Sequence, residues 1–168
     1  MVIIRKATIT DLEAITEIYN DAIINTIATF DTQPKTLKEQ KEWFRSHDSK
    51  HPILVVEEGP NILGWASLGE LSHRPAYSIA AEISLYIKKE YRGMGFGKRL
   101  LEAILQEGRK VGLHTVIARI VEGNKISVHL FESFGFNHIG ILKEVGRKFG
   151  KLLDVHLMQK IFKDDHTV

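Results

Sequence analysis

The chain has 168 residues, of which 43% are hydrophobic and 26% charged, and its formal net charge is +2. This composition is typical of a globular protein, and the length suits one domain spanning residues 1–168. The small net charge gives no reason to expect a nucleic-acid partner, and the absence of cysteine excludes disulfides, thiolate zinc sites and a cysteine nucleophile.

The eight histidines are scattered without metal-ligand spacing, so no metal is expected. No secretory signal or membrane-length apolar run is present, so we expect a cytoplasmic protein without a membrane partner.

Hydrophobic periodicity predicts regular elements along the whole chain. In order, they are a strand over 2–7, helices over 11–25 and 36–44, strands over 53–57, 62–68 and 82–88, a helix over 97–111, a strand over 114–121, a helix over 124–134, and strands over 136–145 and 152–161. Thr8 or Thr10 is placed to cap the first helix and Thr36 the second, while Gly112 and Gly135 follow the third and fourth.

The resulting order β-α-α-β-β-β-α-β-α-β-β predicts a mixed α/β fold with helices on both faces of a mixed sheet. Residues 71–77 are expected to form a loop, and Gly146 and Gly150 the turn between the last two strands. Trp43, Phe44 and Trp65 are expected to pack in the core.

One segment places glycines and cations between a predicted strand and a predicted helix. It reads Arg92-Gly93-Met94-Gly95-Phe96-Gly97-Lys98. Glycine lets backbone N–H groups converge on phosphate oxygens, and the N-terminus of a helix adds the positive end of its dipole. The segment therefore predicts a pyrophosphate site, the alternative being a basic glycine-rich turn that only aids solubility.

Two common phosphate motifs do not fit this segment. A Walker A loop requires a glycine where Arg92 stands and a hydroxyl where Arg99 stands. A dinucleotide fingerprint spaces its glycines as G-x-G-x-x-G, whereas these recur at every second residue, without an obvious ribose-binding acid downstream.

The remaining pattern, R-x-x-G-x-G, resembles the acetyl-CoA loop of the GNAT superfamily of N-acetyltransferases. Over residues 2–161 the chain is similar to one branch of it, the phosphinothricin and methionine sulfoximine acetyltransferases. The matching segments are Ile18-Tyr19-Asn20, Thr29-Phe30, Arg74-Pro75-Ala76-Tyr77, Ala81-Glu82-Ile83-Ser84-Leu85-Tyr86-Ile87, Asn124-Lys125-Ile126-Ser127, Gly146-Arg147-Lys148-Phe149-Gly150 and Leu153-Asp154-Val155. The resemblance implies a GNAT-like, mostly antiparallel twisted sheet, a homodimer, and an acetyl-CoA crevice where the fourth and fifth strands part.

By this resemblance, the protein transfers an acetyl group from acetyl-CoA to the α-amine of a small amino acid analogue. The coenzyme is expected to contact the backbone of Leu85, Tyr86 and Ile87, the glycine run from Arg92 to Lys98, and the side chains of Asn124 and Ser133. Asn124 also suits a helix N-cap, and the two roles are compatible.

Glu82 is the expected base, acting directly or through water, although a strand glutamate can also simply face solvent. Arg74 is expected to pair with the acceptor's acidic group unless it is only a surface arginine. The other residues expected around the acceptor are Phe30, Pro75, Ala76, Tyr77, Ile83 and Ser84.

One position departs from the wider superfamily, in which a tyrosine in the short helix after Asn124 protonates the leaving thiolate. Here that position falls on Phe131, which has no proton to give. Phe131 therefore keeps open a non-catalytic acyl-CoA-binding module. Independently of Phe131, the same fold keeps open acetylation of a different amine, such as a polyamine, an antibiotic or a protein N-terminus.

Overall fold

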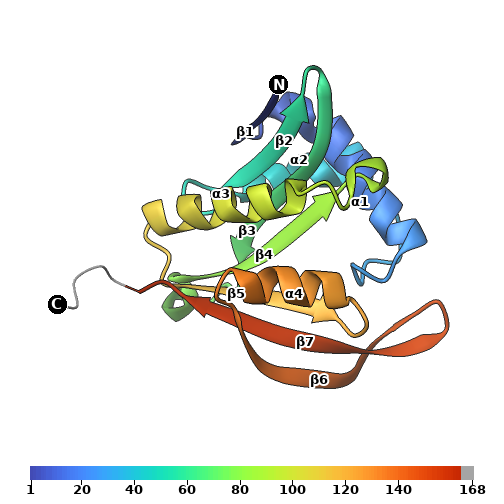
Figure 1. The fold of residues 1–168 in the computed structure, drawn as a ribbon, viewed down its shortest axis with the longest axis vertical. Helices are drawn as coiled ribbons and strands as arrows, with labels where there is room; N and C mark the ends of the chain where they lie inside the picture. Colours follow the sequence, from blue (N-terminus) through green and yellow to red (C-terminus); the bar gives the residue numbers. More distant parts are fainter. Residues whose placement is uncertain (164–168) are drawn as a thin grey trace.

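Seven strands form one sheet in the order β1-β2-β3-β4-β5-β7-β6, seen in a computed structural model that describes residues 1–163 (Figure 1). The strands are β1 (Val2–Lys6), β2 (Ile53–Glu58), β3 (Asn61–Glu70), β4 (Ala80–Ile87), β5 (Thr115–Val121), β6 (Asn137–Lys148) and β7 (Lys151–Ile161). Every neighbouring pair is antiparallel except β4 and β5. The predicted order of elements and the mostly antiparallel sheet are confirmed.

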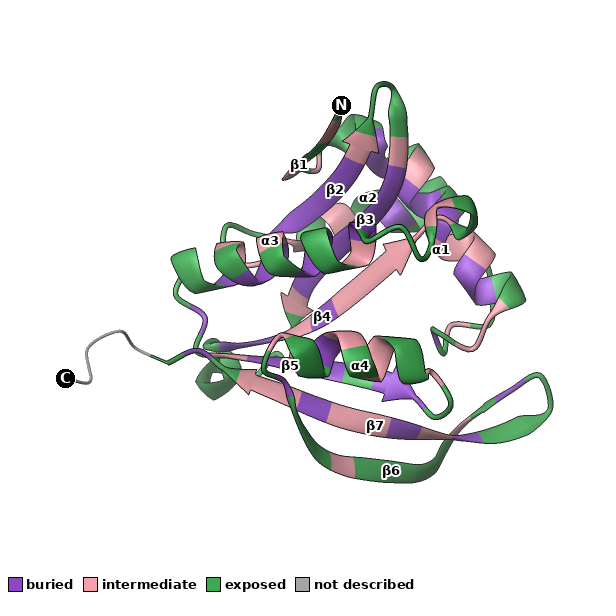
Figure 2. Ribbon diagram, viewed as in Figure 1, coloured by how far each residue is buried: buried purple, intermediate pink, exposed green. Residues whose placement is uncertain are grey.

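Four α-helices cover the two faces of this sheet (Figure 1). They are α1 (Leu12–Asn25), α2 (Leu37–Ser46), α3 (Phe96–Lys110) and α4 (Lys125–Ser133). Helices α1 and α2 lie on one face and α3 and α4 on the other, because each pair packs against a different cluster of buried residues. Figure 2 marks the buried residues along the ribbon. Among residues 1–163, no helix combines the length and apolar composition needed to cross a membrane.

Local residue chemistry sets the helix boundaries. Thr36 caps α2 as predicted, since its Oγ1 accepts from the Glu39 N–H at 3.2 Å and its own N–H donates to Glu39 Oε2 at 2.7 Å. Helix α1 begins one residue later than predicted, because the 3-10 turn Ile9–Asp11 precedes it. Thr8 starts that turn, and its N–H donates to Asp11 Oδ2 at 2.7 Å.

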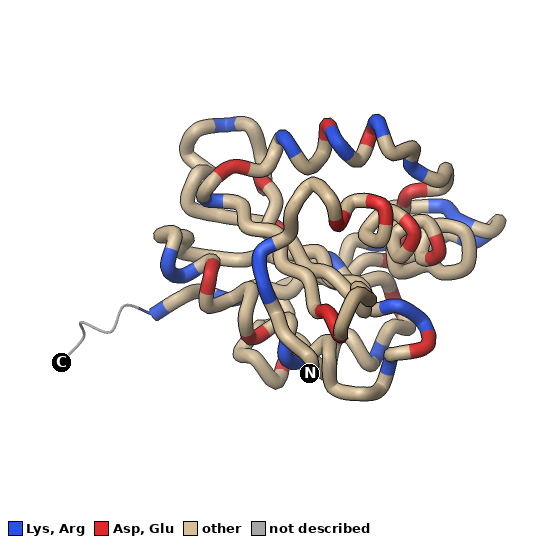
Figure 3. Tube along the Cα trace, turned by 90° about the horizontal axis from the view of Figure 1, so that it is seen from above, with Lys and Arg blue, Asp and Glu red and all other residues tan. Residues whose placement is uncertain are grey.

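The larger core cluster lies between the sheet and α3, where Leu100, Leu101 and Ile104 are fully buried. The smaller cluster lies beneath α1 and α2 and contains the buried Trp65, and the half-buried Trp43 and Phe44 pack against this cluster. All three aromatics are therefore core residues, as predicted. Lys and Arg are interspersed with Asp and Glu along the trace (Figure 3).

Two segments differ from the sequence prediction. Gly146 is not in the last turn but inside β6, opposite Leu153; the turn is Phe149 and Gly150, with φ of +51° and +74°. A two-residue hairpin turn with both φ values positive matches the right-handed twist of its strands, so the chain reverses there instead. The predicted loop over residues 71–77 contains a turn of 3-10 helix, Pro75–Tyr77.

Candidate active site

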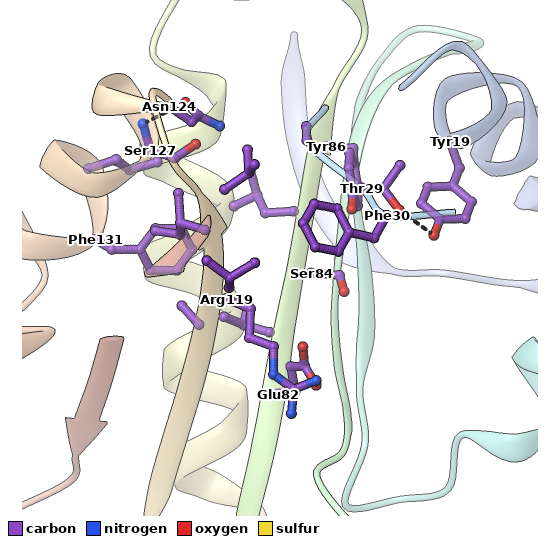
Figure 4. Close-up of a pocket in the computed structure, with 18 residues that line it drawn as sticks. Tyr19, Thr29, Phe30, Glu82, Ser84, Tyr86, Arg119, Asn124, Ser127 and Phe131 are labelled. Carbon is purple, nitrogen blue, oxygen red and sulfur yellow. Dashed lines mark hydrogen bonds and ion pairs between the residues drawn. The ribbon is translucent and has the colours of Figure 1, made fainter. Parts of the chain in front are cut away.

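The parallel strands β4 and β5 separate like a fork. Their ladder comprises only three rungs and ends where Glu82 faces Ile117, although β4 continues to Ile87 and β5 to Val121. A cleft of about 350 Å³ fills the gap beyond this last rung (Figure 4). Its walls are Tyr19, Ala28, Thr29, Phe30, Glu82, Ile83, Ser84, Leu85, Tyr86, Ala118, Arg119, Ile120, Val121, Asn124, Ser127, Leu130, Phe131 and Val155.

Side-chain alternation divides β4 between the two faces of the sheet. Tyr86 packs against Tyr19 and Trp65 on the α1 and α2 face, with ring centroids 5.2 and 5.0 Å away. Glu82 and Ser84 have the same parity and share this face. Leu85 packs against the core cluster beneath α3 on the opposite face. The cleft thus joins a polar face beside α1 and α2 to an apolar face beside α3 and α4.

The glycine run follows β4 and opens α3. Gly93 and Gly95 have φ of +76° and +85°, and a Cβ added at either position would meet no atom within 4 Å. Gly95 is the N-cap of α3, a 15-residue helix, so the free N–H groups of its first turn face this open space. This geometry suits a diphosphate. The Phe96 side chain points into the core, where it packs against Tyr91, so residue 96 can offer a phosphate only its backbone.

Glu82 meets a partner that the sequence analysis did not identify. Arg119 Nη1 lies 3.1 Å from Glu82 Oε2, and the pair closes the narrow end of the fork (Figure 4). Burial raises the pKa of Glu82, and the charge of Arg119 partly opposes that rise. The only sequence signal for Arg119 was a cation among the apolar residues of a strand, Thr-Val-Ile-Ala-Arg-Ile-Val.

On the α4 side, Asn124 caps the helix as predicted, since its Oδ1 accepts from the Ser127 N–H at 3.2 Å. The amide of Asn124 also lines the cleft, and Phe131 forms part of the cleft wall. Ser133 is not brought to the cleft. It lies at the other end of α4, where its hydroxyl donates to the Leu130 carbonyl at 2.6 Å.

The wall opposite α4 is the loop between α1 and α2, and strand β6 fixes its position. The buried Lys148 donates from Nζ to the Thr29 carbonyl at 2.8 Å, and the Thr29 hydroxyl pairs with Tyr19 Oη at 3.0 Å. Phe30 lies so close to Gly146 that a Cβ there would be 2.3 Å from the ring. Gly146 and Lys148 thus hold Thr29 and Phe30 against the cleft from a distant part of the chain.

Several residues predicted to contact the acceptor lie elsewhere. Arg74 precedes the 3-10 helix Pro75–Tyr77, all of these residues are exposed, and none lines the cleft. The predicted acceptor residues that the structure does bring to the cleft are Phe30, Glu82, Ile83 and Ser84.

We expect Gly146→Ala to weaken acceptor binding without weakening coenzyme binding. The new methyl group would overlap the Phe30 ring, and such overpacking commonly costs about 1–3 kcal/mol, equivalent to about 5- to 150-fold in the acceptor KM if the cost falls on acceptor binding. Steady-state kinetics with each substrate varied in turn measures the effect. Gly140→Ala on the same strand is the control, since a Cβ there meets nothing within 4 Å. An unchanged acceptor KM in Gly146→Ala would contradict this contact's role.

The fold and cleft are those of a coenzyme-dependent acyltransferase, and comparison with known proteins agrees. The sequence profile of the Acetyltransferase (GNAT) family matches residues 12–136. The L-methionine sulfoximine/L-methionine sulfone acetyltransferase of Pseudomonas aeruginosa is 37% identical over 158 residues, which cover 93% of this chain and 92% of that protein. An L-amino acid N-acyltransferase of Escherichia coli is 35% identical, over 93% of this chain and 91% of the other.

Among solved structures, a putative acetyltransferase from Salmonella typhimurium, determined with its cofactor acetyl-CoA, superimposes with a TM-score of 0.94 at 32% identity, covering 100% of this chain and 97% of the other. The chain therefore belongs to the acetyltransferase (GNAT) family.

Proposed function

We propose that this protein transfers an acetyl group from acetyl-CoA to the α-amine of a small amino acid analogue of the phosphinothricin, methionine sulfoximine or methionine sulfone type. The observation that carries the proposal is the fork between β4 and β5, with Glu82 on the face of α1 and α2 and the glycine turn at the open end of β4. Of the relatives named above, one is a methionine sulfoximine and methionine sulfone acetyltransferase and the other an L-amino acid N-acyltransferase, and both support an amino acid as the acceptor.

The residues of the fork suit acetyl-CoA. The open turn at Gly93 and Gly95 would receive its diphosphate, with Arg92 and Lys98 as nearby cations. From Leu85 to Ile87, β4 pairs with β3 but no longer with β5, so its edge facing β5 would receive the pantetheine arm, with Asn124 on the opposite wall. When bound, acetyl-CoA supplies an activated acetyl group whose C–S bond breaks as the C–N bond to the amine forms.

Glu82 is the residue that we propose removes the amine proton, directly or through a water molecule. It stands at the last rung of the β4–β5 ladder, where both faces of the sheet are accessible through the gap. A pKa raised by burial makes its carboxylate a stronger base than a solvent-exposed glutamate. Phe131 offers no acid for the departing thiolate, so this anion would leave unprotonated or take its proton from solvent.

A panel of acceptors tests this function. Thiol release from acetyl-CoA should be fastest with phosphinothricin, methionine sulfoximine or methionine sulfone, and slow with spermidine and with a short peptide bearing a free N-terminus. Reactions without acceptor give the background. Turnover only with the polyamine or the peptide would overturn the amino acid assignment, and tight acetyl-CoA binding without any turnover would indicate a non-catalytic module.

We also propose that the protein forms a homodimer through β6. This strand is one edge of the sheet and carries the exposed apolar residues Ile139, Ile141 and Val145, an arrangement that invites pairing with a second copy. Light scattering should give twice the 19.1 kDa mass of the chain, and a mass of 19.1 kDa would contradict the proposal.

A further inference from the structure

The cleft contains one pair of opposite charges. Of all the residues that line it in the described part of the chain, only Glu82 and Arg119 carry charged side chains. They come from different strands but share a face: Glu82 is opposite Ile117 in the parallel ladder, and Arg119 is two residues further along β5. That face is the one beside α1 and α2, where Ser84 and Phe30 also line the cleft.

The guanidinium of Arg119 has donors to spare. It is half exposed, and its one ionic contact within residues 1–163 is the 3.1 Å approach of Nη1 to Glu82. An arginine carries five N–H donors in a planar fork that matches a carboxylate. Arg119 therefore retains the capacity to bind a second anionic group that enters the cleft.

Other nearby cations are placed less well for an acceptor in this cleft. Arg74 does not line it, and Lys35, in a neighbouring pocket beneath α2, is paired with Asp31 at 3.3 Å. The coenzyme-side cations Arg92 and Lys98 precede and begin α3, outside the cleft lining. Among the residues that line the cleft, Arg119 is thus the cation that an acceptor's carboxylate would contact beside Glu82.

We propose that Arg119 binds the α-carboxylate of the acceptor while Glu82 faces its amino group, so that the zwitterion of an α-amino acid inserts between the two charges. This proposal rests on the proposed function. In an α-amino acid the two charged groups are bonded to the same carbon, which fits a carboxylate and a guanidinium that are already in contact.

Charge balance gives this arrangement its selectivity. A zwitterion adds no net charge to the cleft, and each of its ends meets an opposite charge. A polyamine or another amine without a carboxylate would add a cation beside Arg119 and leave the guanidinium without an anionic partner from the ligand. Selectivity of this kind combines an attraction for the right ligand with a repulsion against the wrong one. Arg119 is thereby a specificity-determining residue for amino acid acceptors.

Arg119→Gln and Arg119→Lys, each tested against matched acceptors, examine the proposal. The acceptors are L-methionine sulfone and its carboxamide, which keeps the amine and removes the acidic group. We expect Arg119→Gln to raise the KM for the acid about 10- to 100-fold and to change that for the carboxamide by less than about twofold, with Arg119→Lys in between. Arg45→Gln, an exposed arginine at the end of α2, is the control for loss of a positive charge.

Calorimetric titration of the same two compounds into protein saturated with CoA gives a second readout that needs no turnover. Arg119-dependent binding of the acid supports the proposal even if no acceptor is acetylated, in which case only the proposed function fails.

Two results would overturn the role of Arg119 and leave the proposed function standing. In the first, Arg119→Gln acetylates amino acids and keeps the wild-type preference for the acid over the carboxamide. In the second, Arg119→Gln loses affinity equally for both compounds, because Arg119 would then act only through Glu82. If the preference for the acid over the carboxamide is lost in Arg74→Gln and kept in Arg119→Gln, Arg74 and not Arg119 binds the carboxylate. If neither compound binds to the wild-type protein, both proposals are rejected.

Discussion

Glu82→Gln is expected to lower kcat by about 10²- to 10⁴-fold while the KM for acetyl-CoA stays nearly constant. The amide keeps the size and the polarity of the side chain but cannot accept the amine proton. The loss should concentrate in kcat, because Glu82 is on the α1 and α2 face of the cleft, away from the glycine turn that would hold the diphosphate. Steady-state kinetics with acetyl-CoA and a saturating amino acid measures both constants.

The pH profile gives an independent test of the same residue. A general base must be ionised, so activity should fall as the pH falls through the pKa of Glu82, which burial raises above that of an exposed glutamate. The acidic limb of the wild-type profile should therefore be absent from Glu82→Gln. Glu58→Gln, an exposed change at the end of β2, serves as the control. Wild-type turnover in Glu82→Gln would remove Glu82 from the mechanism.

The features that were predictable from sequence depend on short segments. A glycine run between an alternating strand and an amphipathic helix indicates a phosphate-binding turn by itself, and the structure places Gly95 at the N-terminus of α3. Thr36 and Asn124 were identifiable as caps because a cap binds backbone groups only three residues away. Glu82 could be placed on a strand, and the resemblance to the GNAT superfamily predicted the fork between the fourth and fifth strands.

The features that escaped prediction depend on contacts between distant segments. Gly146 was assigned to a turn because glycine is common in turns, whereas its closest neighbour is the Phe30 ring, far away in the sequence. Arg119 was not considered, because the strand that carries it meets β4 only in the folded sheet. Arg74 has the charge expected of a carboxylate ligand, but the sequence does not specify that its segment lies outside the cleft lining.

Gly95→Val is expected to lower the stability of the protein and to weaken coenzyme binding by about 10-fold or more. The φ of +85° at this position is one that a β-branched residue rarely adopts, at a cost of about 1–3 kcal/mol. The branched side chain would also occupy the open space in front of the first turn of α3, where no protein atom lies within 4 Å of the added Cβ. The Kd of CoA from calorimetry measures the loss of affinity, and the thermal melting temperature measures the loss of stability.

Gly112→Val separates strain from obstruction. Gly112 follows the other end of the same helix with a φ of +87°, and a Cβ there also meets nothing within 4 Å. Both variants should therefore lose similar thermal stability through backbone strain, and only Gly95→Val should lose CoA affinity, because only the N-terminal end of α3 presents free N–H groups to an anion. Equal CoA affinity in the two variants would place the diphosphate elsewhere. A loss of affinity confined to Gly95→Val would show that the open space before α3, and not the stability of the helix, is what the coenzyme requires.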